Sequence, residues 1–137
     1  MTSVVQLIRS ASLADAPYAY AATAPAGSRL IFLAGSCPLN EDGTTASPGD
    51  YAAQAAQCMK TLTEALEAAG ARLTDVISTR VLVASSDQAD LVEAWDVVHA
   101  AFGTHDVPST LLGVTVLGYS DQLVEIEAVA AVRGEQQ

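Results

Sequence analysis

The stretch SPGDYAAQAAQCMKTLTEALEAAGARLTDVISTRVLVA, residues 47–84, contains both kinds of periodicity that decide the fold. In its first half, apolar residues recur at helical spacing and form one face of an α-helix, at Ala52, Ala55, Met59, Leu62, Leu66 and Ala69. We expect Ser47 to cap this helix, with Pro48 at its first position and Asp50 in its first turn. Gly70 supplies the left-handed residue at which the helix ends.

The second half of the stretch changes to the alternation of a β-strand over residues 75–84. One face of this strand consists of Ile77, Thr79, Val81 and Val83, and the other of Ser78, Arg80 and Leu82. A helix followed directly by such a strand indicates a protein in which helices pack on a sheet.

The same patterns recur on both sides of this helix–strand pair. Apolar, β-branched or alternating runs predict further strands over residues 3–9, 18–22, 29–34, 109–117 and 123–132. Helical spacing predicts a second helix over residues 89–102, ended by Gly103. The order is β-β-β-α-β-α-β-β. We therefore expect a single α+β domain over residues 1–137, with two helices on one face of a mixed sheet of about six strands.

The second face of this sheet is too apolar to be left in water. Leu111 and Leu117 alternate with Leu112 and Val114, so apolar side chains lie on both faces of that strand. Two helices cover only one face. We expect the other face to meet another subunit, because large exposed apolar patches mark interaction sites.

Charge and composition exclude several classes of function. The chain has 6 Lys and Arg residues against 16 Asp and Glu residues, for a net charge of −10. So few bases disfavour binding to nucleic acid or to an anionic membrane surface. The two cysteines, Cys37 and Cys58, have no metal-site spacing, and the chain shows neither a signal-peptide pattern nor a long apolar span. We expect a cytoplasmic protein with reduced cysteines.

Glu125 and Glu127 are the first candidates for chemistry. Their spacing on a strand puts both carboxylates on one face. In a buried cleft, mutual repulsion and desolvation would raise at least one pKa, which suits a general acid or base. On an exposed strand the same pair would simply be solvated, and the spacing alone favours this interpretation.

Other candidate residues each have a structural alternative. His99 and His105 lack partners at any recognisable catalytic spacing, which favours surface or loop positions. No base adjoins Cys37 in the sequence, so a structural role is favoured over a nucleophilic one. Trp95 has the spacing of a core residue or of a cleft wall. Arg80 could anchor an anion or form a salt bridge with one of the many acids.

Four motifs, taken in order, resemble the reactive-intermediate deaminases (the Rid family, formerly YjgF) over nearly the whole chain. They are Ala16-Pro17-Tyr18 with Ala21, LAGSCPL at residues 33–39, ALEAAGARLTD at 65–75 and VEIEAVA at 124–130. The resemblance implies a chorismate-mutase-like subunit in a homotrimer, with clefts for a small-molecule ligand between neighbouring subunits. The implied activity is hydrolysis of enamines and imines, such as 2-aminoacrylate, to keto acids and ammonia. No metal or organic cofactor is implied.

Three residues match the functional positions of the family. Glu125 corresponds to the glutamate that positions the water, Tyr18 to an early tyrosine of the cleft, and Gly35 to a strand-end glycine whose backbone lines the cleft.

Three other positions depart from the family pattern. Thr110 stands where an arginine ordinarily holds the substrate carboxylate, Leu112 where a cysteine is common, and Trp95 where many members have an asparagine. A charge-assisted contact contributes roughly 1.5–3 kcal/mol, which a neutral hydroxyl does not replace. We expect a more apolar cleft for a larger, neutral or aromatic ligand. Arg80 could restore carboxylate binding only by reaching this cleft.

These departures leave two functions open. The chain is either an imine or enamine hydrolase with an altered cleft or a non-catalytic trimer that binds a small molecule. A nuclease role, sometimes attached to this family, fits poorly because the sequence has no basic patch.

Overall fold

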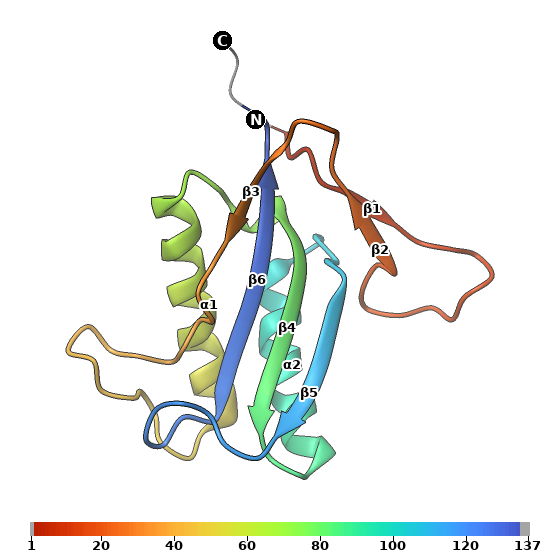
Figure 1. Ribbon diagram of the computed structural model, residues 1–137. Coiled ribbons are helices and arrows are strands. Elements are labelled where there is room, and N and C mark those ends of the chain that lie inside the picture. Colours follow the sequence, from red (N-terminus) through yellow and green to blue (C-terminus); the bar gives the residue numbers. More distant parts are fainter. Residues whose placement is uncertain (1, 135–137) are drawn as a thin grey trace.

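Both helices lie on one side of a four-stranded sheet in the computed structural model, which describes residues 2–134 (Figure 1). The sheet has the strand order β3-β6-β4-β5. Strands β4 and β5 run parallel, whereas β3–β6 and β4–β6 are antiparallel. The elements are β1 (Gln6–Ile8), β2 (Ala21–Thr23), β3 (Arg29–Phe32), α1 (Tyr51–Ala68), a short 3₁₀ helix (Leu73–Asp75), β4 (Val76–Ala84), α2 (Gln88–Phe102), β5 (Ser109–Val114) and β6 (Val124–Val132).

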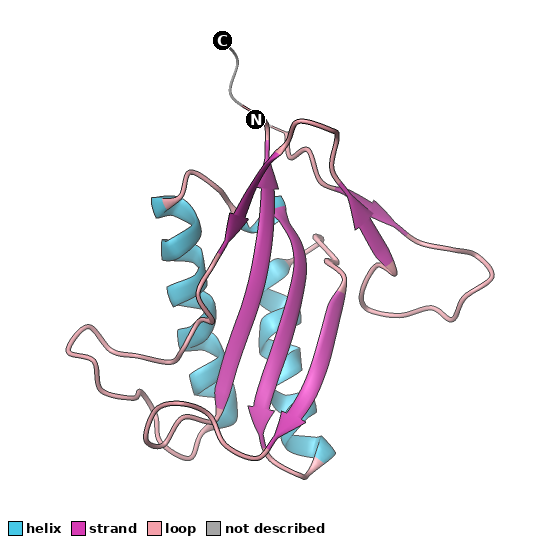
Figure 2. Cartoon of the chain, in the orientation of Figure 1, coloured by secondary structure: helices cyan, strands magenta, loops and turns pink. Residues whose placement is uncertain are grey.

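The predicted order of strands and helices is confirmed. The prediction that all six strands form a single sheet is wrong, because the strands form a sheet of four and a sheet of two. Strands β1 and β2 pair only with each other and form a separate hairpin beyond β5 (Figures 1 and 2). The segment before β2 attaches elsewhere, since the Ala19 amide donates to the carbonyl of Asp106 at 2.8 Å. Tyr18 therefore lies in a loop rather than in the predicted strand.

The first helix begins later than the sequence predicted. Ser47, Pro48, Gly49 and Asp50 form a turn in which the Asp50 amide donates to the Ser47 carbonyl at 3.1 Å. Proline at the second position and glycine at φ +84° at the third are typical of a type II turn. The cap is Asp50, whose carboxylate accepts from the Ala53 amide at 2.9 Å. Gly70, at φ +82°, follows the helix end as expected.

A bulge at the start of β4 changes one predicted side-chain orientation. The register with β6 shifts between Val76 and Ser78. As a result Val76 is fully buried, while the predicted inward residue Ile77 is only half-buried. From Thr79 onward the predicted alternation holds, with Val81 and Val83 fully buried.

The core fills the space between the helices and the sheet. Its largest fully buried side chains include Leu62 and Leu66 of α1, Val98 of α2, and Ile126 of β6. None of the helices and strands within residues 2–134 covers most of the opposite face, and Phe32 is 75% exposed there. The sheet thus has one packed face and one open face.

Candidate functional site

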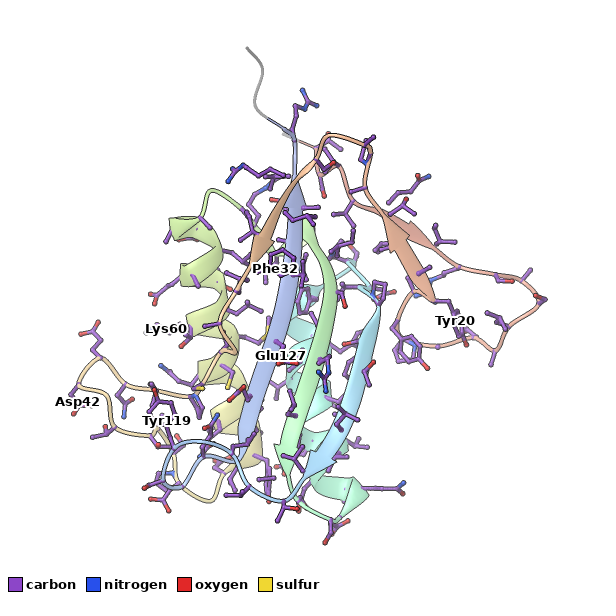
Figure 3. All side chains as sticks on the ribbon, in the orientation of Figure 1. Tyr20, Phe32, Asp42, Lys60, Tyr119 and Glu127 are labelled. Atoms are coloured by element: carbon purple, nitrogen blue, oxygen red, sulfur yellow. The ribbon has the colours of Figure 1, made fainter. Side chains whose placement is uncertain are left out.

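Polar residues form a row across the middle of the open face. In the strand registers, Arg80 of β4 lies opposite Glu127 of β6 and, on its other side, opposite Thr110 of β5. The Arg80 guanidinium and the Glu127 carboxylate form an ion pair at 3.1 Å. Figure 3 shows Glu127 and Phe32 on the side of the sheet away from the helices. The salt bridge considered for Arg80 from the sequence is therefore present.

A second row lies one step along the strands. Leu82 of β4 lies between Glu125 of β6 and Leu112 of β5. Glu125 and Glu127 share the open face, as their spacing predicted, and both are half-buried. Leu82 and Leu112 are also half-buried, so the surroundings of Glu125 on this face are apolar along the β5 direction.

The Glu125 side chain is held by polar contacts with the segment after β3 and with the loop before β6. Ser36 forms a two-way backbone bridge with Ile126, which brings residues 35–37 alongside β6. Glu125 Oε1 accepts from Cys37 Sγ at 3.3 Å and from Gln122 Nε2 at 3.2 Å. A Cβ added at Gly35 would lie 2.3 Å from Glu125 Oε2. Glycine at this position is therefore required for the carboxylate to lie where it does.

The Cys37 thiol is protonated at neutral pH. Burial and the hydrogen bond to Glu125 raise the pKa of Cys37 to about 11. A thiol of this kind is a poor nucleophile, in line with the structural role favoured from the sequence. It donates to Glu125 and so helps to fix the carboxylate.

A second group of predicted residues surrounds a hollow beside the edge strand β5. The hollow has a volume of about 380 Å³ and is lined by Pro17, Tyr18, Trp95, Ser109, Thr110 and Leu111. The Tyr18 and Trp95 rings meet edge to face, with centroids 6.5 Å apart. Trp95 also packs against the core, in line with its helical spacing. Thr110 is exposed at the rim.

The chain does not bring its two groups of predicted residues together. Glu125 and Gly35 lie at β6, whereas Tyr18, Trp95 and Thr110 lie at β5, two strands away. Two strand spacings amount to about 10 Å, and Glu125 is also one row further along than Thr110. A small ligand cannot contact both groups within one chain.

The sequence did not predict several of the side-chain contacts around these two groups of residues. Gln122 is buried and donates to Glu125. The one feature of the sequence that points to this contact is an amide side chain three residues before the glutamate. Both histidines have partners: His99 stacks on Trp95, and the His105 ring lies 2.7 Å from the Val76 carbonyl. Arg9 pairs with Asp106 across 97 residues, which no local pattern could predict.

Within residues 2–134 no cluster of three His, Cys, Asp or Glu side chains is arranged to hold a metal ion. None of the helices in the same range has the length and apolar character that a bilayer crossing requires.

Comparisons with known proteins cover almost the whole chain. The profile of the family described as Endoribonuclease L-PSP matches residues 9–132. A 2-iminobutanoate/2-iminopropanoate deaminase of Rattus norvegicus is 27% identical over 130 residues, which are 95% of this chain and 93% of that protein.

Solved structures of the same kind have a similar fold. The protein YyfB of Yersinia pestis, a Rid-family protein of unknown function, is 26% identical with a TM-score of 0.87, over 94% of this chain and 99% of that chain. Rv2704 of Mycobacterium tuberculosis, of the YjgF/YER057c/UK114 family, is 29% identical with a TM-score of 0.64, over 93% and 99%. The motifs around Tyr18, Gly35 and Glu125, the fold and the family match agree, and this chain is a member of the endoribonuclease L-PSP family, the Rid or YjgF proteins.

Proposed function

We propose that this protein hydrolyses imines or enamines to a carbonyl compound and ammonia, with Glu125 as the catalytic acid and base. The observation that carries the proposal is the placement of Glu125. One carboxylate oxygen accepts from Cys37 and Gln122, while Oε2 has no hydrogen bond with any residue from 2 to 134. Oε2 lies over Gly35 and can accept a proton from a water molecule.

The reaction needs only this group and water. Water attacks the imine carbon and gives one proton to Glu125, which passes it to the nitrogen, so that a carbinolamine forms. Glu125 then takes the second proton from the carbinolamine hydroxyl and delivers it to the nitrogen as the carbon–nitrogen bond breaks and the carbonyl forms. One imine and one water thus yield one carbonyl compound and one ammonia. The deaminase activity named for the rat relative has the same overall chemistry.

The substrate we propose is larger or less charged than a small imino acid. Thr110 offers a neutral hydroxyl where the family pattern has an arginine. Arg80 is the adjacent base on this face, but its guanidinium is already paired with Glu127 at 3.1 Å. A small imino acid would gain little from this arrangement, because a neutral hydroxyl binds a carboxylate more weakly than a charge-assisted contact does. Tyr18, Trp95 and Leu112 favour apolar ligand groups instead.

We further propose that the complete site forms between copies of the chain in a homotrimer. Two observations support this assembly. The Glu125 group and the Tyr18–Trp95 group are too far apart in one chain to contact one small ligand. The open face also exposes Phe32 and Leu30, which are 75% and 53% exposed. A second copy would cover this face and could bring the two groups together.

The test is ammonia release from imines generated in situ, both 2-iminopropionate and bulkier imines such as those with an aromatic side chain. We expect turnover of the bulkier imines that Glu125→Gln abolishes, because the amide cannot accept the proton from water. Glu67→Gln, on the exposed side of α1, is the control and keeps the activity.

Thr110→Arg adds a second arm to the experiment. We expect it to improve the use of 2-iminopropionate by lowering KM. Brisk turnover of 2-iminopropionate that Glu125→Gln leaves unchanged would contradict the proposal. Ligand-dependent thermal stabilisation without any turnover would instead support the non-catalytic binding protein.

A further inference from the structure

A closed ring of contacts joins the N-terminal segment to helix α2. Arg9 Nη2 donates to Asp106 Oδ2 at 2.8 Å, and Asp106 Oδ1 lies 3.3 Å from His99 Nε2. The His99 ring stacks on Trp95 at an interplanar angle of 9°, and Trp95 meets Tyr18 edge to face. The ring closes because Arg9 Nη1 also donates to the Tyr18 carbonyl at 3.1 Å.

The ring brings three separate parts of the chain together. Arg9 follows the end of β1, Asp106 lies in the loop between α2 and β5, and Trp95 and His99 lie one turn apart on the same side of α2. The Asp106 carbonyl also accepts from the Ala19 amide at 2.8 Å. The loop that carries Tyr18 is thereby fixed to the loop that leads into β5.

Two members of the ring are walls of the hollow beside β5. Tyr18 and Trp95 line its volume of about 380 Å³. Arg9, Asp106 and His99 do not line it, but each contacts a wall residue or the residue that holds one. Because β1 and β2 do not join the main sheet, strand pairing does not fix Tyr18 in place. The side-chain ring can do so.

Each contact in the ring is weak by itself. An exposed ion pair and a single pair of aromatic rings each contribute little to stability when they act alone. In a closed ring each residue contacts two neighbours, Tyr18 through its ring and its backbone carbonyl, so ordering one residue lowers the entropic cost of ordering the next. Loss of any one link should therefore loosen the whole set.

We propose that Arg9, Asp106 and His99 are positioning residues that hold the Tyr18 and Trp95 rings in the geometry needed for ligand binding. This proposal rests on the proposed function in one respect, which is that the hollow belongs to the ligand site. The positioning itself can be measured without any ligand.

Trp95 is the reporter, since it is the only tryptophan of the chain. The experiment compares Asp106→Ala, Arg9→Ala and the double variant with the unaltered protein. Near-UV circular dichroism and acrylamide quenching report the packing of Trp95, and far-UV circular dichroism confirms that the variants fold. We expect each single variant to lose the near-UV tryptophan signal and to increase the quenching. The double variant should change little further, because the first loss already opens the ring.

Three further variants distinguish loss of a contact in the ring from a general effect of substitution. Arg9→Lys retains the charge and should restore much of the tryptophan signal. His99→Phe keeps a stacking ring but cuts the link to Asp106, so it should show increased quenching. Glu93→Gln, exposed on α2, should leave the signal unchanged. An unaltered Trp95 signal in both Asp106→Ala and Arg9→Ala overturns the proposal.

Measurement of KM and kcat for Asp106→Ala distinguishes failure of this proposal from failure of the proposed function. We expect Asp106→Ala to raise KM for bulky imines more than it lowers kcat, since Glu125 is untouched. A changed Trp95 signal with an unchanged KM supports the ring as a positioning device and overturns the assignment of the hollow to the ligand site. Loss of activity in Glu125→Gln is independent of either result.

Discussion

Alternate residues of β6 face two different surroundings. On the side of the helices, Val124, Ile126 and Ala130 are fully buried. On the other side, Glu125 and Glu127 are half-buried and the sheet surface is open. Because side chains alternate along a strand, one segment can hold the core and present a carboxylate without conflict between the two roles. Substitutions one residue apart on β6 should therefore have different effects. We expect those on the helix side to change stability, and those on the open side to change chemistry and assembly.

The largest effect on stability is expected at the packed face. Ile126→Ala should lower the free energy of unfolding by about 2–5 kcal/mol, since it removes a fully buried side chain and leaves a cavity. Urea unfolding followed by circular dichroism measures the loss. Val92→Ala, on the exposed side of α2, is the control and should change the free energy by no more than about 0.5 kcal/mol.

The open face provides the contrasting substitution. Phe32→Ala removes a side chain that is 75% exposed in one chain, so the fold should persist. If a second copy covers this face, the same change should reduce the molar mass measured by light scattering. Equal losses of unfolding free energy for Ile126→Ala and Phe32→Ala, with no change of mass, would contradict the distinction between the faces.

A smaller effect on stability, with a large effect on turnover, is expected for Gly35→Ala. The added methyl group would lie 2.3 Å from Glu125 Oε2, and the flexible carboxylate must move away. Stability should change by no more than about 1 kcal/mol, whereas ammonia release should fall because the carboxylate is displaced. Gly118→Ala, where nothing lies within 4 Å, is the matched control. Full activity in Gly35→Ala would show that the position of Glu125 does not matter.

The smallest expected effect is a change of reactivity rather than of stability. With its pKa raised from 9.0 to about 11, Cys37 has a thiolate fraction roughly a hundredfold below that of an ordinary thiol at neutral pH. Alkylation by iodoacetamide, followed by peptide mass spectrometry, should therefore be slow at pH 8 and rise steeply towards pH 11. Glu125→Gln removes the adjacent negative charge, lowers the pKa of Cys37 and should accelerate alkylation at pH 8. An unchanged rate would contradict the contact between these two side chains.

Local sequence rules predicted most of the regular structure because that information lies within a few residues. The apolar spacing from Ala55 to Leu66 fixes the buried face of α1, and Gly70 and Gly103 end the two helices in left-handed geometry. The alternation in β4 and β6 places Arg80 and the two glutamates on one face. The predicted start of α1 was wrong because Pro48-Gly49 is compatible with a turn as well as with a helix N-terminus. In the structure these residues form the turn.

The candidate site depended far more on tertiary structure. Family motifs indicated Tyr18, Gly35 and Glu125, but nothing near Glu125 in the sequence shows that Cys37 donates to it across 88 residues. The pairing of Arg9 with Asp106 spans 97 residues. The β1–β2 hairpin, which is separate from the main sheet, is likewise attached through long-range contacts, those of Ala19 and Arg9 with Asp106.

Local patterns alone set the order of elements and the placement of Glu125 and Glu127 on one face of a strand, because helical and strand periods are properties of neighbouring residues. Long-range packing places Glu125 over Gly35, pairs Arg80 with Glu127, and puts the aromatic side chains of the hollow two strands away from Glu125. These are distances between segments remote in the chain. Packing of the whole fold sets such distances, and no local pattern encodes them.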